Sequence, residues 1–97
     1  DGLYWAMVDS AHAALIAAKI MPPSPEHIPD KLKENFVKQK MLKQKYVDDY
    51  IKIHDIAKDI VHGKTINIKG KQIDELIEKS NDFLNEMAKL VDKIIEK

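Results

Sequence analysis

The sequence predicts an all-α protein, specifically an up-and-down antiparallel four-helix bundle formed by a single domain over residues 1–97. Apolar residues recur every three or four positions in long segments, and the connections between these segments are short and contain proline or glycine. Of the 97 residues, 44% are apolar and 33% are charged, which is typical of a globular domain. A chain of this length forms one core, and short connections favour antiparallel neighbours.

The first helix is expected over residues 3–20. This segment contains six alanines and few strongly polar residues, namely Asp9, Ser10, His12 and Lys19. A thin helix that is apolar nearly all round is expected to be buried on most sides, within the bundle or against another chain. The turn MPPSPEHIP ends it, and a shorter helix is expected over residues 29–38.

The third helix is expected over residues 43–62, followed by Gly63 as a stop. Its apolar stripe consists of Tyr46, Tyr50, Ile53, Ala57 and Ile60. At about 100° per residue, the solvent-facing side consists of Asp48, Lys52, Asp55, Asp59 and His62.

The fourth helix is expected over residues 71–96, with the clearest apolar stripe of the chain. The stripe consists of Ile73, Ile77, Ser80, Leu84, Met87, Val91 and Ile94, flanked by Leu76, Phe83, Leu90 and Ile95. Before it, residues 65–68 alternate polar and apolar side chains, which fits either an extended piece or an ordered connection. We favour a connection that packs Ile66 or Ile68 on the bundle.

The composition excludes several classes of function. Cysteine is absent, so disulfide scaffolds, thiolate metal sites and thiol catalysis are excluded. All sixteen basic residues are lysine, which excludes bidentate guanidinium contacts to phosphate, and sixteen acidic residues balance them. Metal-ligand motifs are absent, so we expect no metal and no cofactor. With no membrane helix and no secretory signal pattern, a cytoplasmic location is expected.

Charge is nevertheless segregated along the chain. Residues 31–45 contain six lysines and one acid, whereas residues 73–97 contain seven acids and four lysines. The basic segment could contact phosphates, but no stacking pattern of aromatic residues accompanies it. A solvated surface is the favoured interpretation.

The four histidines are the side chains that titrate near neutrality. His12 and Ser10 point away from each other on a helix, so they form a poor nucleophile pair and are expected to make interior hydrogen bonds. His54 falls in the apolar arc of its helix, which indicates a packed, hydrogen-bonded side chain rather than a ligand. His27 lies in the proline-rich turn and is expected to cap a helix or to be solvated.

His62 is the strongest candidate for chemistry. Asp59 precedes it by three residues and can orient the imidazole, while Lys58 lies one turn earlier and can meet an anionic phosphate. The alternative is that Lys58 and His62 simply complement the dipole at the end of a helix.

Two strings resemble a known family. YIKIHDIAKDIVHGKTINIKGKQIDELIEKSNDFLNEMAKL resembles the second half of a HEPN domain, a small helical bundle often found with minimal nucleotidyltransferases. LYWAMVDSAHAALIAAKIMPPSPEHIP resembles the first helix and turn of the archaeal branch, in which a nucleotidyltransferase domain precedes the HEPN domain. Since the chain begins at Asp1 rather than methionine, we expect it to be the C-terminal part of a longer chain.

The resemblance implies a homodimer and a possible ribonuclease site. Many members are ribonuclease toxins in which a histidine transfers protons and an arginine holds the scissile phosphate, with two copies meeting at the dimer cleft. His62 matches the histidine, but Ala57 occupies the place of the arginine and Lys58 is the nearest cation. A lysine provides a point charge instead of a planar fork, so the departure argues against ribonuclease activity.

Three hypotheses follow from these residues. The favoured one is a non-catalytic dimerising HEPN-type module that partners a nucleotidyltransferase in cis or trans, with nucleotide or RNA contacts at Lys58, His62 and Lys64. The second is a metal-independent ribonuclease toxin of a toxin–antitoxin pair that uses His62, with Lys58 and Asp59 in support. The third is a purely structural helical domain. The dimer is expected to use the first helix or the surface near His62.

Overall fold

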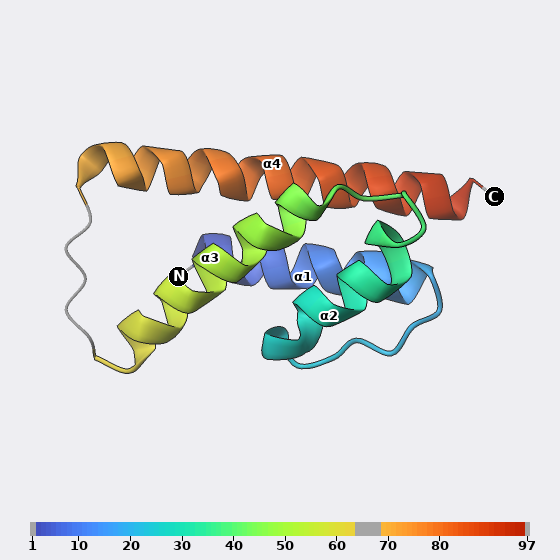
Figure 1. Ribbon diagram of the computed structural model, residues 1–97, viewed down its shortest axis with the longest axis horizontal. Helices are drawn as coiled ribbons and strands as arrows, with labels where there is room; N and C mark the ends of the chain where they lie inside the picture. The colour runs from blue at the N-terminus through green and yellow to red at the C-terminus, as the bar shows by residue number, and fades with distance from the viewer. Residues whose placement is uncertain (1, 64–68, 97) are drawn as a thin grey trace.

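A computed structural model describes residues 2–63 and 69–96, and helices are the only regular structure in that part of the chain (Figure 1). The long helices are α1 (Gly2–Ala17), α3 (Gln44–Val61) and α4 (Gly70–Ile95). Between α1 and α3 lie three short helices, η1 (Pro25–His27), α2 (Ile28–Leu32) and η2 (Lys33–Val37). The all-helical prediction is therefore confirmed, whereas the expected connection at residues 65–68, with Ile66 and Ile68, lies outside the described residues.

The segment expected as one helix over residues 29–38 consists of pieces of different type. The helical region begins before residue 29, with the 3₁₀ turn η1, continues into α2 and ends in the π-helical turn η2. In that last turn the Lys38 amide donates to the Lys33 carbonyl at 3.0 Å, which is an i→i+5 hydrogen bond. Such wider turns are local changes of helical pitch that a periodicity argument does not detect.

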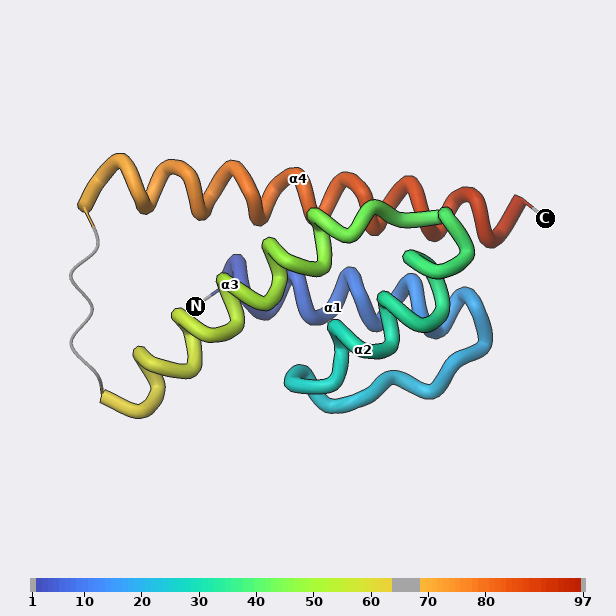
Figure 2. Tube along the Cα trace, in the orientation of Figure 1, coloured from blue at the N-terminus to red at the C-terminus, as the bar shows by residue number. Residues whose placement is uncertain are grey.

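The order of the helices in space differs from a simple up-and-down bundle. The tube in Figure 2 shows α1, α2 and α4 running in one direction and α3 alone running back. The reason is the connection over residues 18–24, which is not a tight turn. It leaves α1 at Lys19, where φ is 63°, and then returns along the bundle in an extended form. The five residues after Lys19, residues 20–24, span at most about 17 Å when extended, and they carry the chain back toward the start of a second parallel pass.

Two hydrogen bonds fix this returning connection to the bundle. Nε2 of His12 on α1 donates to the Pro23 carbonyl at 2.8 Å, and the hydroxyl of Tyr50 on α3 donates to the Pro25 carbonyl at 2.8 Å. Prolines carry no amide hydrogen but keep a carbonyl that needs a partner when it is covered. His12 therefore makes the interior hydrogen bond that the sequence predicted.

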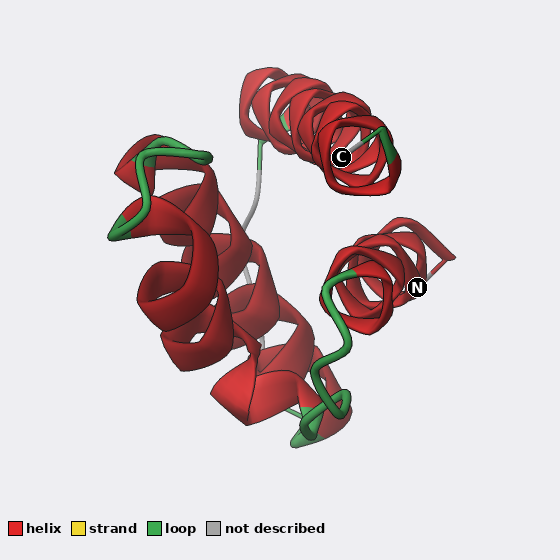
Figure 3. Ribbon diagram, turned by 90° about the vertical axis from the view of Figure 1, so that its right-hand side faces the viewer, coloured by secondary structure: helices red, strands yellow, loops and turns green. Residues whose placement is uncertain are grey.

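The core lies where α1, the α2 region, α3 and α4 meet. Viewed along the bundle, α4 lies beside α1, and α3 with the α2 region packs on the other side (Figure 3). The alanines Ala11 and Ala14 are fully buried, so α1 lets its neighbours approach closely. The larger buried side chains are Met7, Leu15, Ile28, Leu32, Phe36, Val47, Tyr50, Phe83, Met87 and Leu90. Within this chain α1 is buried along one side, because Trp5 and Ile16 are more than half exposed, and the expected burial against another chain stays a prediction.

The buried side of α4 is centred on Phe83 and Leu90, which the sequence placed at the flanks of the stripe. Ser80, the polar residue of the predicted stripe, is buried, and its hydroxyl donates to the Leu76 carbonyl at 2.8 Å. The first turns of α4 are different, because Ile73 and Ile77 remain 45% and 40% exposed. Figure 1 gives the reason: α3 diverges from α4 toward the C-terminal end of α3, so α3 does not cover the first turns of α4.

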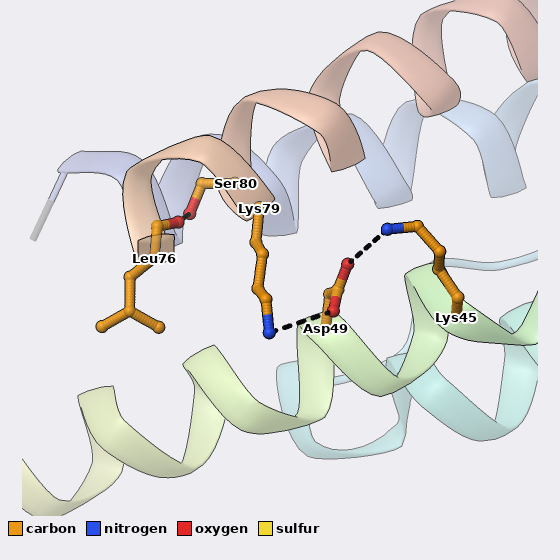
Figure 4. Close-up of polar contacts among 5 residues, drawn as sticks. All are labelled: Lys45, Asp49, Leu76, Lys79 and Ser80. Atoms are coloured by element: carbon orange, nitrogen blue, oxygen red, sulfur yellow. Dashed lines mark hydrogen bonds and ion pairs between the residues drawn. The ribbon is translucent and has the colours of Figure 1, made fainter. Parts of the chain in front are cut away.

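A buried carboxylate lies just before the two helices separate. Asp49 of α3 is 8% exposed, and its oxygens lie 3.9 Å from the ammonium groups of Lys45 and Lys79 (Figure 4). Its Oδ2 is buried and accepts no hydrogen bond within the described part of the chain. Asp49 lies at the border between the polar and apolar arcs of α3 and belongs to neither set of residues that the sequence predicted.

Candidate functional site

A groove of about 650 Å³ opens where α3 and α4 diverge. We call it the open-end groove. Its walls come from the last turns of α3 and the first turns of α4, and the beginning of α1 contributes a third side (Figure 1). The residues that line it are Leu3, Tyr4, Trp5, Pro25, Glu26, Ile53, His54, Ile56, Ala57, Lys58, Ile60, Val61, Ile73, Leu76, Ile77 and Ser80. A volume of this size falls within the range of known binding sites.

The lining is mostly apolar, and much of it is accessible. Trp5 is 56% exposed, Ile60 is 57% exposed and Val61 is 81% exposed, and Ile73 and Ile77 lie on the opposite wall. Single exposed apolar residues are common on proteins, but a contiguous group around a hollow is typical of an interaction site. The groove is therefore the main candidate for function in the described structure.

Aromatic side chains and a histidine form one side of this groove. The Tyr4 hydroxyl and Nδ1 of His54 form a hydrogen bond of 2.8 Å, and the rings of His54 and Tyr50 stack with centroids 5.9 Å apart. Trp5 meets the Tyr4 ring edge-on at 5.3 Å. Burial raises the pKa of the Tyr4 and Tyr50 hydroxyls above the usual value for tyrosine, because the phenolate is poorly solvated there. The hydrogen bond to Tyr4 and the stacking on Tyr50 confirm the prediction that His54 is packed and hydrogen-bonded.

The two charged residues that line the groove differ in their pairing. Glu26 lies 3.8 Å from Nε2 of the exposed His27. Lys58 is exposed, and within the described residues no carboxylate lies within 4.0 Å of its ammonium group. Lys58, on the α3 wall, therefore has no ion-pair partner among the described residues.

The structure brings Lys58 and His62 to the same end of α3. The His62 amide donates to the Lys58 carbonyl at 3.0 Å, and Gly63 follows with a φ of 75°, which ends the helix. The His62 imidazole is exposed, as predicted, and makes no hydrogen bond within residues 2–63 and 69–96. Asp59 is half-buried on the same turn. Lys58 lines the groove but His62 does not, and Lys64 lies outside the described residues.

The remaining predicted polar residues have structural roles. The Ser10 hydroxyl donates to the Met7 carbonyl at 2.9 Å, so Ser10 and His12 bond to different backbone groups and form no catalytic pair. His27 is exposed beside Glu26, as expected for the turn. The described side chains include no group of three or more potential metal ligands. None of the described helices combines the length and the apolar character that crossing a membrane requires.

Sequence reasoning missed the groove itself. The sequence contains a signal for the groove, namely apolar residues on both sides of the connection between the third and fourth helices. Ile60 and Val61 precede this connection, and Ile73 and Ile77 follow it. By their spacing, Ile60, Ile73 and Ile77 are expected in the apolar stripes of their helices, and Val61 is expected at the flank of its stripe. Whether they pack on each other or remain open depends on the angle between α3 and α4, which periodicity does not determine.

Comparisons of the chain with protein-family models, with curated protein sequences and with solved structures gave no match.

Proposed function

We propose that this chain is a non-catalytic interaction module of the HEPN type, which pairs with a second copy and binds a nucleotidyltransferase domain in cis or trans. The observation that carries the proposal is the open-end groove, whose accessible walls include Trp5, Ile60 and Val61. Removing such apolar surface from water is favourable by about 25 cal/mol per Å². A partner that covers this face therefore lowers the free energy of the complex.

The surroundings of His62 support a binding role over catalysis. General acid–base catalysis needs an oriented imidazole, and transfer at a phosphate needs donors that converge on it. Within the described residues, His62 has no hydrogen-bonded partner for its ring, and Lys58 is the cation one turn away. We propose that Lys58, His62 and Lys64 serve at most as contacts for the phosphate of a nucleotide or RNA.

For the second copy we assign the outer side of α1. Ala13 and Ile16 are exposed there, and a surface with small side chains allows another helix to approach closely. This choice leaves the open-end groove free for a different partner.

Sedimentation equilibrium tests the pairing. We expect the wild-type chain to self-associate, Ile16→Glu to shift it to monomer, and Ile51→Glu, a matched change at an exposed isoleucine of α3, to leave the association unchanged. A monomer at every concentration would contradict the pairing.

An RNA cleavage assay in the presence of a chelator tests the lack of catalysis. We expect no cleavage by the wild-type chain. Cleavage that disappears in His62→Ala would instead establish the ribonuclease hypothesis, with Lys58 in place of the arginine.

A further inference from the structure

We infer that the open-end groove binds a two-turn amphipathic helix of a partner protein, and that this helix directs an acidic side chain at Lys58. The inference rests on the proposed function as an interaction module, and it specifies which structural element of a partner the groove accepts. Three observations carry it: the length of the groove, the direction of its walls, and the unpaired charge on one of them.

The length comes from the lining residues. On α3 the wall extends from Ile53 to Val61, and on α4 it extends from Ile73 to Ser80. At a rise of 1.5 Å per residue, both walls are about 10–12 Å long. This equals two turns of helix, which would present three or four apolar side chains at positions i, i+3, i+4 and i+7.

The walls are themselves two helices that diverge, with α1 beneath them (Figure 1). Side chains of an added helix can pack as ridges into the grooves between neighbouring side chains of α3 and α4, as in any helical bundle. An extended peptide would find no exposed strand edge among the described residues, so β-augmentation has no template here. The geometry therefore favours a helical occupant.

Charge complementarity specifies one more feature of the occupant. An apolar helix seated over Lys58 would remove water from an ammonium group that has no described carboxylate nearby. Covering a charge without a partner is costly, whereas an acidic side chain next to the apolar stripe would compensate it. Glu26, the other charged residue of the lining, forms no ion pair with Lys58 within 4.0 Å and so does not serve as this partner.

A second copy of the chain does not supply such a helix. In the proposed pairing the exposed outer side of α1 already contacts the second copy, and the core stripes of α3 and α4 face the shared core, so a further contact would bring the groove of one copy against the groove of the other. Two concave surfaces leave space between them, and a two-fold contact would bring two unpaired Lys58 side chains toward each other. Both effects disfavour this arrangement.

The experiment uses two synthetic helical peptides with leucines at i, i+3, i+4 and i+7 and no aromatic residue. They differ at one position beside the stripe, which is Glu in one peptide and Lys in the other. Binding to the intact chain is followed by the fluorescence of Trp5, the single tryptophan and part of the groove lining. We expect the Glu peptide to bind up to about fivefold more tightly at low salt, which corresponds to the value of about 1 kcal/mol at the upper end for exposed ion pairs.

Two charge-reversal variants test the assignment to Lys58. Lys58→Glu should reverse the preference between the peptides, whereas Lys52→Glu, an exposed position on α3 outside the groove lining, should retain it. Circular dichroism of both variants establishes that they fold. Equal binding of the two peptides, or a preference that Lys58→Glu does not alter, would overturn the charge assignment.

The failure of this inference can be told apart from failure of the proposed function. If neither peptide binds while the wild-type chain still self-associates, the helix inference is wrong and the interaction module stands. If neither peptide binds and the chain stays monomeric, both are wrong. Binding of the apolar dye anilinonaphthalene sulfonate without binding of either peptide would also overturn the inference, because the groove would then accept only small molecules.

Discussion

Replacing Tyr50 by phenylalanine tests how the returning connection is held against the bundle. The Tyr50 ring is fully buried, and its hydroxyl donates to the Pro25 carbonyl at 2.8 Å. Removing the hydroxyl leaves that carbonyl without this donor, and losses of this kind destabilise proteins by about 1–2 kcal/mol. For a domain of this size, that corresponds to a decrease of about 4–15 °C in the midpoint of thermal unfolding. Because Pro25 lines the open-end groove, peptide binding should weaken as well.

The matched control is Tyr46→Phe, one turn earlier on α3. Tyr46 is half-buried, and its hydroxyl makes no hydrogen bond in the described structure, so its loss should change stability by less than about 0.5 kcal/mol. Both variants are measured by thermal and urea unfolding monitored by circular dichroism. Equal stability of Tyr50→Phe and wild type would refute the reasoning, since it would mean that the connection does not depend on this bond.

Three further changes have defined outcomes. Burial raises the pKa of Tyr4 and Tyr50 above the value near 10 that tyrosine has in the unfolded chain. Their contribution to stability is therefore complete below about pH 10 and is lost as the pH rises above it. Urea unfolding at increasing pH should show this decline, and Tyr50→Phe should make the decline smaller. Lys19 and Lys40 have φ of 63° and 60°, a left-handed backbone conformation that glycine adopts with less steric strain than other residues. Lys19→Gly and Lys40→Gly should therefore each stabilise the fold by about 0.5–1 kcal/mol, measured by urea unfolding. Alanine at either position should not stabilise it. Asp49→Leu should stabilise the fold by about 1 kcal/mol, because it removes a buried carboxylate oxygen that has no hydrogen bond, while Lys45 and Lys79 can both reach water. Thermal unfolding measures this change. A lower midpoint for the variant would show that the two ion pairs outweigh the cost of burying the carboxylate.

The long helices were predictable because a single periodic signal determines each one. In α3 and α4 the apolar spacing is sustained over several turns, and Gly63 marks the end of α3, so the observed ends differ from the expected ones by one residue. The histidine assignments were also accessible, since position on a helix distinguishes the packed His54 from the exposed His62. These are local properties of the sequence.

The direction of the helices was not predictable from the same signals. The segment with Pro22 and Pro23 was correctly identified as a break after α1, but a break can be either a tight turn or an extended return. The distinction depends on distant partners, namely the hydrogen bonds from His12 and Tyr50 that hold the returning chain. A periodicity argument has no access to contacts between residues that lie 11 and 25 positions apart.

The candidate site follows from that topology rather than from a motif. Among the described long helices α3 is the one that runs back, and it crosses the pair formed by α1 and α4 at an angle instead of lying along it (Figures 1 and 3). The crossing places Tyr50 against Phe83, with ring centroids 5.7 Å apart, and leaves Ile60 and Ile73 beyond it with exposed side chains. Stability and binding are thus assigned to different turns of the same helices. Truncation of the buried rings at the crossing, Tyr50 and Phe83, should destabilise the fold, whereas substitution of the exposed Ile60 or Ile73 beyond it should alter binding and leave the fold intact.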